Sequence, residues 1–314
     1  MAADLAIIIV GWNARDWLLR CLASLPAGAA GLDVETWVVD NASTDGTVEA
    51  VARAFPQVHL IANTANLGFA AANNQAAGQT DSRYLLLLNP DTEVPPDMLR
   101  RLVAYADEHP AVGALGPQLR NLDGSPQRSC WRGYPDLGMA LTDALYLWKL
   151  PWLPLAQRSE FQAAELGAPR SVDHLLGACL LIRGRAWEQV GPLDAGYFLF
   201  LEETDWCRRA QRAGWDIVYH PQIWITHAGQ HSMRQAPARN LPHLYRSYTR
   251  FYRNGRQHTG GRGRVLLLKL IFALAILVRL GLWSLRWLRN PAERSQARPM
   301  LHGYGQVLRL LPGL

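Results

Sequence analysis

Acidic residues are almost absent from the last third of this 314-residue chain. Positions 217–314 hold 15 Lys+Arg and a single acid, Glu293, which gives a formal charge of +14. Residues 1–216 hold 17 Lys+Arg and 25 Asp+Glu, a formal charge of −8, so the net charge of +6 conceals a division. The sequence therefore predicts an acidic body followed by a basic tail.

Cysteine is also scarce, and no two cysteines form a CxxC pair. This excludes a cysteine zinc cluster and gives no disulfide framework, so reduced thiols in the cytoplasm are the simpler interpretation. The four cysteines are Cys21, Cys130, Cys179 and Cys207.

The N-terminus lacks the pattern of a secretory signal. Its apolar run, Leu5–Val10, has only six residues, follows Asp4 and has no basic segment before it. We expect this run to be the first core strand instead. Hydrophobic residues at 49% and charged residues at 18% indicate a globular protein. The length allows one large domain with an appendage, or two modest domains.

Short apolar runs alternate with helix-length segments over the first 110 residues. This alternation predicts an α/β fold whose mostly parallel sheet has helices on both faces. Right-handed crossovers would bring every strand-to-helix loop to one edge. We expect strands at Leu5–Val10, Val34–Asp40, Val58–Asn63 and Tyr84–Asn89, and helices at Ala14–Leu25, Thr44–Phe55, Gly68–Gly78 and Pro96–His109.

The middle section, Gly116–Arg170, is rich in Pro and Trp, and we expect a loop and partial helix that cover the cleft. Regular structure should resume with a buried strand at Leu176–Ile182 and a helix at Glu202–Ala213. Two short strands are expected at Trp215–Tyr219 and Ile223–Thr226.

Asp91 follows the apolar run Tyr84–Asn89. Pro90 has no N–H and must end the strand, so Asp91 would lie at the carboxyl edge, where open α/β sheets bind ligands. A carboxylate at that position suits Mg2+ or Mn2+ carrying a diphosphate. Taken alone, the stretch is equally explained by a solvated turn.

The stretch from Val38 to Thr47 joins a strand to a helix. Ser43 or Thr44 is predicted to cap the helix, with Asp45 in its first turn. Capping leaves Asp40 unexplained. An acceptor at this strand end is well placed to receive the ring N–H of a pyrimidine base.

Three acids, Glu202, Glu203 and Asp205, begin a predicted helix. A carboxylate there could take a proton from a substrate hydroxyl, although acids also favour a first turn for electrostatic reasons alone. Gly177 and its small neighbours would let a ligand approach the backbone, or they simply pack tightly. Arg183 would pair with a diphosphate or form a surface salt bridge.

Five motifs occur in one order along residues 5–232. They are VVDNASTDGT (38–47), NLGFAAANN (66–74), LLLNPD (86–91), GACLLIR (177–183) and FLEETDWCR (200–208). Together they resemble family 2 glycosyltransferases, above all the rhamnosyltransferase-like branch. The resemblance implies a GT-A fold, a nucleotide-diphosphate sugar donor (a dTDP- or UDP-sugar), Mg2+ or Mn2+, and inversion at the anomeric carbon.

The resemblance also implies roles for single residues. Asp40 would contact the base, and Asn66 and Gly68 would line the donor site. Asn89 and Asp91 fall on the metal-binding acidic motif, where Asn89 replaces a common aspartate. The other donor-site candidates are Asn13, Asn41, Asp45 and Gly177.

A late histidine completes the resemblance. The segment from His227 to Ser232 is similar to the family's His-Gly-Ser signature, so His227 would be the second metal ligand, with His231 as an alternative. A structural histidine after a strand is the other interpretation. Glu203 matches the second acid of the family's base motif, and Asp205 is the alternative catalytic base.

The basic tail ends in an apolar segment. Arg234–Arg264 is dense in Arg, His and Tyr, a composition that also suits single-stranded nucleic acid. The next 24 residues, Val265–Leu288, are mostly apolar and long enough to span a bilayer. In a spanning helix the charge of Arg279 would lie near the middle of the bilayer, which would cost ~2.5–3.5 kcal/mol of insertion free energy. A membrane surface is therefore the favoured partner, and nucleic acid is not expected.

Basic residues interrupt this segment along one arc of a helix. Such a stripe suits a helix in the membrane interface, with Trp283 and Trp287 near the headgroups. Packing on the catalytic domain is the other interpretation. The stripe consists of Lys269, Arg279, Arg286 and Arg289.

These patterns predict a catalytic domain over 1–232 and a basic, amphipathic helical region over 233–314 that associates with the membrane. The expected function is transfer of one sugar, L-rhamnose from dTDP-rhamnose, to a lipid-linked or polysaccharide acceptor. The enzyme would be inverting, metal-dependent and peripheral or monotopic on the cytoplasmic face of the inner membrane.

Two rival functions remain open. One is a non-processive transferase that uses UDP-glucose, UDP-galactose or UDP-galactofuranose, and the other is a membrane-anchored nucleotide-sugar binding protein without turnover. A processive synthase is disfavoured because Gln211–Trp215 lacks an Arg before the Trp.

Overall fold

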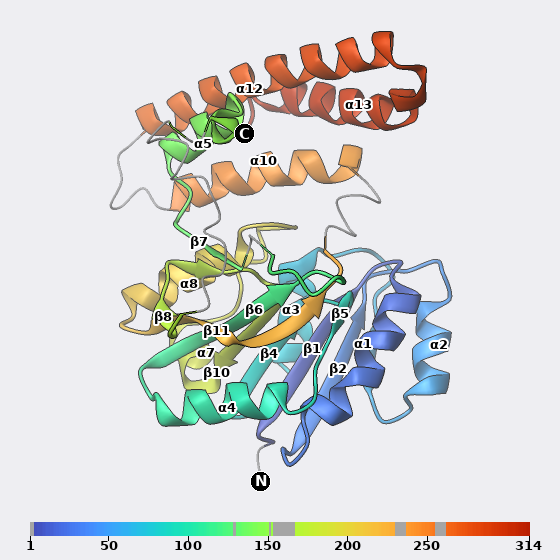
Figure 1. The fold of residues 1–314 in the computed structure, drawn as a ribbon, viewed down its shortest axis with the longest axis vertical. Helices are drawn as coiled ribbons and strands as arrows, with labels where there is room; N and C mark the ends of the chain where they lie inside the picture. Colours follow the sequence, from blue (N-terminus) through green and yellow to red (C-terminus); the bar gives the residue numbers. More distant parts are fainter. Residues whose placement is uncertain (1–2, 128–129, 151, 153–166, 230–236, 255–261) are drawn as a thin grey trace. The chain divides into compact units, whose positions relative to one another are not determined.

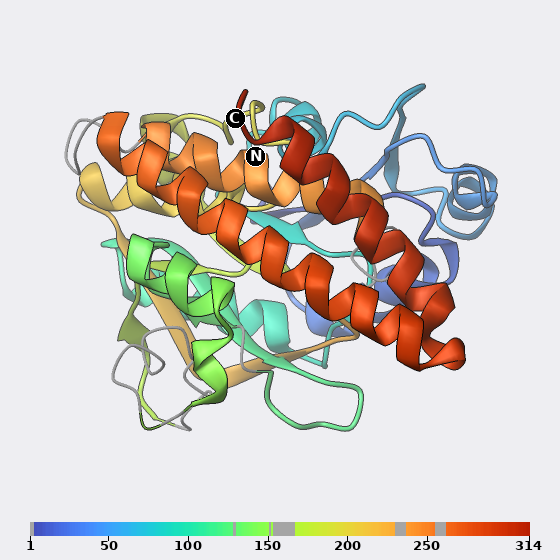
Figure 2. The same cartoon turned by 90° about the horizontal axis from the view of Figure 1, so that it is seen from above.

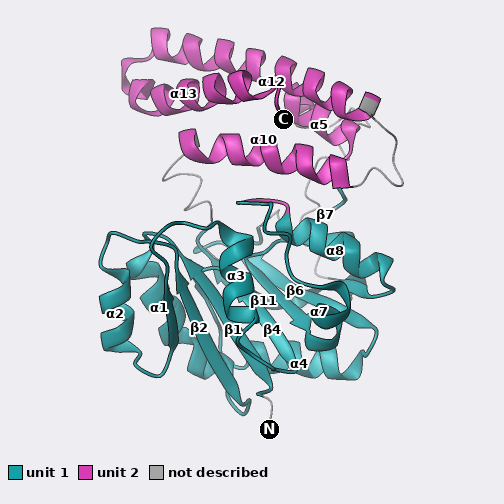
Figure 3. Ribbon diagram, turned by 180° about the vertical axis from the view of Figure 1, so that it is seen from behind, with its two compact units in different colours: residues 1–134, 161–198, 202–229 teal, residues 135–160, 199–201, 230–314 magenta. Residues whose placement is uncertain are grey.

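The computed structural model describes residues 3–127, 130–150, 152, 167–229, 237–254 and 262–314. The chain forms two compact units (Figure 3). Unit 1 comprises Met1–Tyr134, Phe161–Phe198 and Glu202–Gly229. Unit 2 comprises Pro135–Glu160, Leu199–Leu201 and Gln230–Leu314.

Unit 1 is built on one large sheet. Among the described residues its strands run in the order β3-β2-β1-β4-β10-β6-β11-β5, with β8 paired to β11. A separate antiparallel pair is formed by β7 (Trp131–Arg132) and β9 (His174–Leu175). The strands of the large sheet are β1 (Leu5–Gly11), β2 (Val34–Asp40), β3 (His59–Ala62), β4 (Tyr84–Leu88), β5 (Thr92–Glu93), β6 (Val112–Arg120), β8 (Arg170–Ser171), β10 (Cys179–Arg183) and β11 (Asp216–His227).

Most long strands of the sheet are parallel. β1 pairs in parallel with β2 and β4, β2 with β3, and β6 with β11. β10 is inserted between β4 and β6 and runs antiparallel to both. The predicted mostly parallel α/β sheet is confirmed, and β10 is the long exception.

Helices cover both faces of this sheet: α1 and α4 lie on one face and α3 and α7 on the other (Figures 1 and 3). An α/β sheet of this kind is buried on both sides, which explains why its strands are continuous apolar runs rather than alternating ones. The helices of unit 1 are α1 (Arg15–Gly28), α2 (Thr47–Ala54), α3 (Phe69–Ala77), α4 (Met98–Glu108), α7 (Gly184–Val190) and α8 (Glu202–Arg212).

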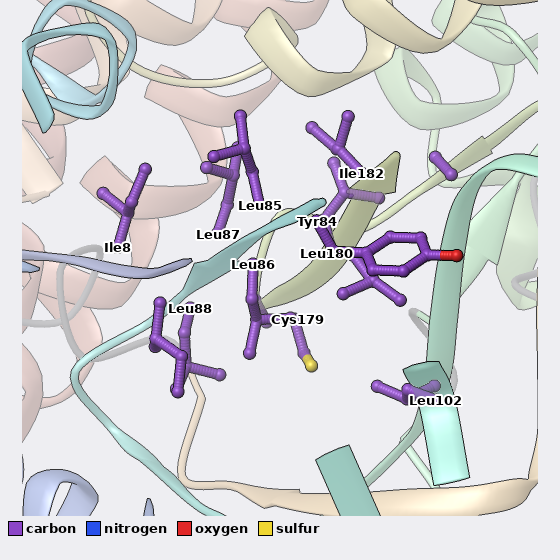
Figure 4. Close-up of a cluster of buried hydrophobic side chains, with 14 of the residues drawn as sticks. Ile8, Tyr84, Leu85, Leu86, Leu87, Leu88, Leu102, Cys179, Leu180 and Ile182 are labelled. Atoms are coloured by element: carbon purple, nitrogen blue, oxygen red, sulfur yellow. The ribbon is translucent and has the colours of Figure 1, made fainter. Parts of the chain in front are cut away.

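The core of unit 1 centres on β4. Leu85 and Leu87 point to one face of the sheet and Leu86 and Leu88 to the other (Figure 4). Leu86, Leu87 and Leu88 have no exposed surface, so each contributes about 1.5–3 kcal/mol of hydrophobic stabilisation. This rigid strand delivers the residues that follow it, Asn89–Asp91, to the carboxyl edge.

β6 begins at Val112, and its last residues, from Gly116 to Arg120, lie in the section that the sequence assigns to a loop. Its glycines serve packing: a Cβ on Gly113 would lie 2.6 Å from the Trp215 Cβ, and one on Gly116 would lie 2.8 Å from Leu175 Cδ2. β11 is one strand where two short ones are predicted. Its pairing with β6 is interrupted between His220 and Trp224, which is where the sequence suggests a gap.

Unit 2 is a helical assembly with its own core. α12 packs against α5 and α13, and α10 packs against α13 (Figure 2). Its core includes Leu268, Ile271 and Phe272 of α12 and Leu241 of α10. The described elements are α5 (Leu137–Ala144), η1 (Leu147–Lys149), α10 (Pro237–Asn254), α12 (Arg262–Arg289), η2 (Pro291–Glu293) and α13 (Arg294–Leu310).

α12 is, among the described residues, the one helix long and apolar enough to cross a membrane, and 33% of its most apolar window is buried within the protein. Its outer face is formed by exposed leucines. The helix is therefore packed on one side and apolar on the other. The exposed leucines of α12 are Leu266, Leu267, Leu270, Leu274, Leu277, Leu282, Leu285 and Leu288.

The predicted basic stripe on α12 is largely engaged within unit 2. Arg279 donates to the carbonyl oxygen of Asp143 at 2.6 Å and stacks over the Tyr146 ring at 4.9 Å. Lys269 donates to the carbonyl of Pro312 at 2.9 Å. Arg279 thus satisfies carbonyls at the end of α5 and is held within unit 2.

Candidate functional site

The predicted polar loops meet at the carboxyl edge of the sheet. Asn41 donates its backbone N–H to Gly11 across the β1 and β2 ends at 2.8 Å, and Asn89 donates to Ala178 at 2.9 Å. Because β10 is antiparallel, its first residues lie at the edge where β1, β2 and β4 end. This reversal brings Gly177 and Ala178 beside the loop that contains Asp91.

Asn13 and Asp45 tie the first two loops together. The Asn13 side-chain oxygen accepts from the Thr44 N–H at 2.8 Å, and Asp45 Oδ2 accepts from the Arg15 N–H at 3.0 Å. These contacts also explain a wrong prediction. The residue that precedes α2 is Gly46, with φ of 80° and no side-chain cap, so Ser43 and Thr44 do not cap the helix.

Asp40 is buried and has one oxygen without a partner. Its Oδ2 accepts from the backbone N–H of Ser43 at 2.9 Å. Its Oδ1 is buried and, among the described residues, has no hydrogen-bond donor. An unsatisfied buried carboxylate oxygen is costly, so a ligand N–H at this position would remove a penalty of about 1–3 kcal/mol.

Asn41, Asn66 and Gly68 shape the next loop. Asn41 Nδ2 donates to the Gly68 carbonyl at 3.1 Å, and Asn66 Oδ1 accepts from the Gly68 N–H at 3.0 Å. Gly68 has φ of 85°, and a Cβ there would lie 2.4 Å from the Phe198 carbonyl oxygen. Only glycine fits, and both asparagines hold it in place.

Asp91 and His227 are brought together from opposite parts of the chain. His227 ends β11 and pairs with Thr92 of β5, and His227 Nε2 lies 3.4 Å from Asp91 Oδ1. Both side chains are only 7% exposed. Asn89 Nδ2 lies 3.4 Å from the same histidine nitrogen. Three residues that the sequence predicts for the site, Asn89, Asp91 and His227, therefore lie together around His227 Nε2.

Gln127 fixes the orientation of His227, and sequence reasoning missed it. Gln127 Nε2 donates to the His227 carbonyl at 2.6 Å and to Asn121 Oδ1 at 3.1 Å. Its oxygen therefore faces His227 Nδ1, 3.0 Å away, and in the neutral imidazole it accepts a hydrogen bond from the Nδ1–H group. The lone pair of His227 is left on Nε2, which faces Asp91.

The signal for Gln127 in the sequence is weak. Asp123 and Gly124 form a turn that returns the chain to β6, where the Gln127 N–H donates to Leu119 at 2.7 Å. The Asp-Gly pair predicts a turn. It does not predict which residue the Gln127 side chain contacts after that turn.

The donor set fits a hard divalent cation. Among the described residues there is no cluster of three His, Cys, Asp or Glu side chains that could hold a metal. Mg2+ and similar ions are commonly held by one or two protein ligands, with water and substrate phosphates completing the shell. Asp91 and His227 supply such a partial set, and His231 lies outside the described residues.

The three acids at the start of α8 have different environments. Asp205 accepts from Arg208 at 2.8 Å and from Arg209 at 3.0 Å, so both of its oxygens are engaged. Burial raises the pKa of Glu203 to about 7. Burial and the neighbouring charge of Glu203 raise the pKa of Glu202 well above its usual value, and Glu202 Oε2 has no partner among the described residues.

Gly177 lies next to Glu203. A Cβ on Gly177 would lie 3.6 Å from Glu203 Cγ and 3.7 Å from the Phe69 ring, which is ordinary contact distance. Gly177 and Phe69 thus lie beside the Glu203 side chain, which is buried. The geometry brings together a small residue and a carboxyl group that can take up a proton near neutral pH.

Arg183 plays neither of its predicted parts. It donates to the carbonyls of Val112 at 2.8 Å and His109 at 3.1 Å, and to Tyr84 Oη at 3.1 Å. Because β10 runs antiparallel, its last residue lies at the edge opposite Asp91. Arg183 therefore stabilises the fold and is not a diphosphate contact.

Comparison with known proteins agrees with this arrangement. A family model described as "Glycosyl transferase family 2" matches residues 6–144. An N-acetylglucosaminyl-diphospho-decaprenol L-rhamnosyltransferase of Mycobacterium tuberculosis is 33% identical over 261 residues, which cover 79% of this chain and 83% of the relative. A rhamnosyltransferase of Escherichia coli K12 is 23% identical over 235 residues, which cover 73% of this chain and 84% of the relative.

A solved structure shows the same fold. It is a mannosyltransferase of Pyrobaculum calidifontis in complex with GDP-mannose and Mn2+, with a TM-score of 0.55 and 16% sequence identity. The match covers 98% of this chain and 88% of that chain. The GT-A architecture expected from the sequence is thereby confirmed.

Proposed function

Because this chain is a glycosyltransferase that belongs to family 2 and to its rhamnosyltransferase-like branch, we propose that it transfers one L-rhamnose from dTDP-rhamnose to a lipid-linked acceptor, with inversion. The rhamnosyltransferase names of its relatives support the sugar, and the decaprenol-linked substrate named for the mycobacterial relative supports the acceptor class. The observation that carries the chemistry is the Asp91–His227 pair, with the histidine lone pair directed to Asp91 by Gln127.

Asp91 and His227 would hold Mg2+ or Mn2+ at this edge, with Asn89 beside them. When bound, the cation would stabilise negative charge on the leaving diphosphate. Asp91 Oδ1 and His227 Nε2 already face each other at 3.4 Å, which supports a shared ligand.

The base of the donor would lie against Asp40. Its unpaired Oδ1 is an acceptor, and thymine and uracil both offer a ring N–H, so this contact suits a dTDP- or UDP-sugar alike. Asn66 and Gly68 would form the wall of the donor site. The remaining donor-site residues in this proposal are Asn13, Asn41, Asp45, Asn89 and Gly177.

Glu203 would be the catalytic base. It would take the proton of the acceptor hydroxyl while the oxygen attacks the anomeric carbon, and the bond to the diphosphate would break on the opposite side. The pKa of about 7 supports this role because such a group is both partly ionised and basic near neutral pH. Asp205, held by two arginines, would position the start of α8 rather than accept the proton.

In this proposal residues 1–232 form the catalytic domain, and the C-terminal region over 233–314 would hold the enzyme on the cytoplasmic face of the inner membrane. The exposed leucines of α12 support this because a row of apolar side chains on one helix face suits the membrane interface. The excess of basic residues over 217–314 suits anionic lipid headgroups.

A donor screen on the purified full chain tests the proposal. With Mn2+ present we expect hydrolysis or transfer from dTDP-rhamnose, no turnover of UDP-glucose, UDP-galactose or UDP-galactofuranose, and no turnover of any donor in EDTA. If only a UDP-sugar were turned over, the proposed donor would be wrong, but the proposed metal-dependent reaction would stand. Tight binding of dTDP-rhamnose by calorimetry without any turnover, in the presence of acceptor lipid, would indicate a binding protein and contradict the proposal.

Replacing Gln127 by leucine should weaken metal binding without removing a ligand. The substitution leaves His227 Nδ1 without its acceptor. Loss of such a partner typically lowers metal affinity by about 10- to 100-fold, and we expect a loss in that range here. We expect the Mn2+ concentration for half-maximal turnover to rise by that factor while turnover at saturating Mn2+ stays near the parent rate.

Gln211→Leu is the matched control, because Gln211 makes similar buried contacts with Tyr134 at 2.6 Å and Val172 at 2.8 Å away from the histidine. An unchanged Mn2+ requirement in Gln127→Leu would refute the positioning role. An equal rise of the Mn2+ requirement in Gln127→Leu and Gln211→Leu would also refute the positioning role of Gln127.

A further inference from the structure

A basic groove runs between α10 and α13 within unit 2. It encloses about 630 Å³ and is lined by polar and cationic side chains from both helices. The active-site proposal uses none of these residues. The groove is formed chiefly by Arg239, His243 and Arg246 of α10 and His302, Gln306 and Arg309 of α13.

The lining residues follow one helical spacing on each helix. Arg239, His243 and Arg246 stand at i, i+4 and i+7, which places them on one face of α10. The three groove residues of α13 repeat the same spacing. Each stripe covers two turns, about 10 Å of helix. Cations thus face one space over a length that suits an anion larger than a single phosphate.

The groove lies in the most basic part of the chain. Glu293 is the only acid between residues 217 and 314, and it accepts from Asn290 at 2.9 Å with Arg286 4.0 Å away. The field is visible at His243, where burial and then the charges of Arg246 and Arg239 lower the pKa. An anion in the groove would relieve this repulsion.

The two helices are held close by a glycine. A Cβ on Gly303 of α13 would lie 2.9 Å from the Cα of Ala238 and 2.9 Å from Leu241 Cδ1. Gly303 therefore lets α13 approach α10, and Ala238 also lines the groove. Arg246 and Arg309 remain exposed beside this contact, so they are accessible to a ligand.

We propose that this groove binds the diphosphate group of a lipid-linked acceptor. Guanidinium groups bind phosphate oxygens through charge-assisted, often bidentate hydrogen bonds. In the groove α10 offers two such groups, Arg239 and Arg246, and α13 offers one, Arg309. The exposed leucines of α12 in the same unit give the lipid chain an apolar surface. The inference rests on the proposed function for its acceptor class and names the residues that recognise it.

The test uses the full chain and its double variant Arg246→Gln/Arg309→Gln. Binding is measured by flotation with phosphatidylcholine vesicles that contain polyprenyl diphosphate, polyprenyl monophosphate or phosphatidylglycerol. We expect the parent to prefer the diphosphate vesicles. We expect the variant to lose about tenfold in affinity for them, since exposed charges are partly screened. The matched control is Arg289→Gln/Arg298→Gln, which removes two exposed arginines outside the groove.

A loss confined to the groove variant and to the diphosphate vesicles supports the site. Equal losses in both double variants would overturn it, because the effect would then be general electrostatics. Equal binding of mono- and diphosphate vesicles, or a selective loss with phosphatidylglycerol, would assign the groove to another headgroup and would also overturn it. Donor hydrolysis without acceptor should be unchanged in the groove variant, so failure of the donor screen and failure of this test are distinguishable.

Discussion

Replacing Asp91 by asparagine should reduce turnover by about 10²–10³-fold, the range found when one group that stabilises transition-state charge is removed. The substitution keeps the shape of the side chain and the backbone bond from the Ala228 N–H to the Asp91 carbonyl at 2.9 Å. It removes the negative charge that faces His227 Nε2. Initial rates with the active donor, measured across a Mn2+ titration, give the effect.

The control for this prediction is Asp97→Asn. Asp97 is an aspartate of the same region that directly precedes α4, but it is 52% exposed and pairs with Arg100 at 3.2 Å. Its replacement removes the same charge and should leave turnover within about twofold, since exposed ion pairs contribute little. Turnover of Asp91→Asn at the rate of this control would mean that Asp91 does not hold the metal.

The carboxyl edge could be predicted from the sequence because buried parallel strands are continuous apolar runs. β1, β2 and β4 are found where these runs occur, and the polar residues after them meet as expected. The contact between Asp91 and His227 could not be deduced in this way. It depends on the end of β11 pairing with β5, and only the family resemblance suggested His227.

β6 shows where local signals mislead. Gly113, Gly116 and Pro117 are typical of a loop, yet the strand is central. Gly113 makes room for Trp215, a packing need that no local pattern reveals. The last residue of β6 that pairs with β10 is Leu115, and beyond it β6 has a paired strand on one side only. Pro117 lies in this later part of β6, where its missing N–H leaves no hydrogen bond to β10 unmade.

The direction of β10 was equally hidden. An apolar run such as Cys179–Ile182 is the same whether its strand is parallel or antiparallel. The direction decides which end meets the ligand edge: it places Gly177 beside Glu203 and Arg183 at the far edge. One unpredicted reversal therefore accounts both for the contact between Gly177 and Glu203 and for the position of Arg183 away from the ligand edge.

The ionisation of Glu203 links activity to stability. In the folded protein its pKa is raised from 4.5 to about 7, so the folded state binds this proton more tightly than the unfolded state does. Below pH 4.5 both states are protonated and the raised pKa has no effect on stability. As the pH rises from about 4.5 to 7, stability is lost, and above pH 7 the full cost of a buried charge is present.

Glu203→Gln should therefore abolish most turnover and stabilise the protein. We expect a loss of about 10²–10⁴-fold in rate. We also expect a gain in unfolding free energy on the order of 3 kcal/mol at pH 8, with none at pH 4. The parent rate should fall about tenfold per pH unit below pH 7, because protonated Glu203 cannot take the acceptor proton.

The matched control is the neighbouring acid. Burial and the charge of Glu203 raise the pKa of Glu202 well above its usual value, and Glu202→Gln keeps the shape of this side chain while it removes its ionisation. We expect that variant to retain turnover within a few-fold and to keep the acidic limb of the pH profile. Rates are measured at saturating Mn2+ and unfolding by denaturant at both pH values. If Glu202→Gln lost turnover and Glu203→Gln kept it, the acceptor proton would pass to Glu202, and the assignment of Glu203 as the base would be refuted.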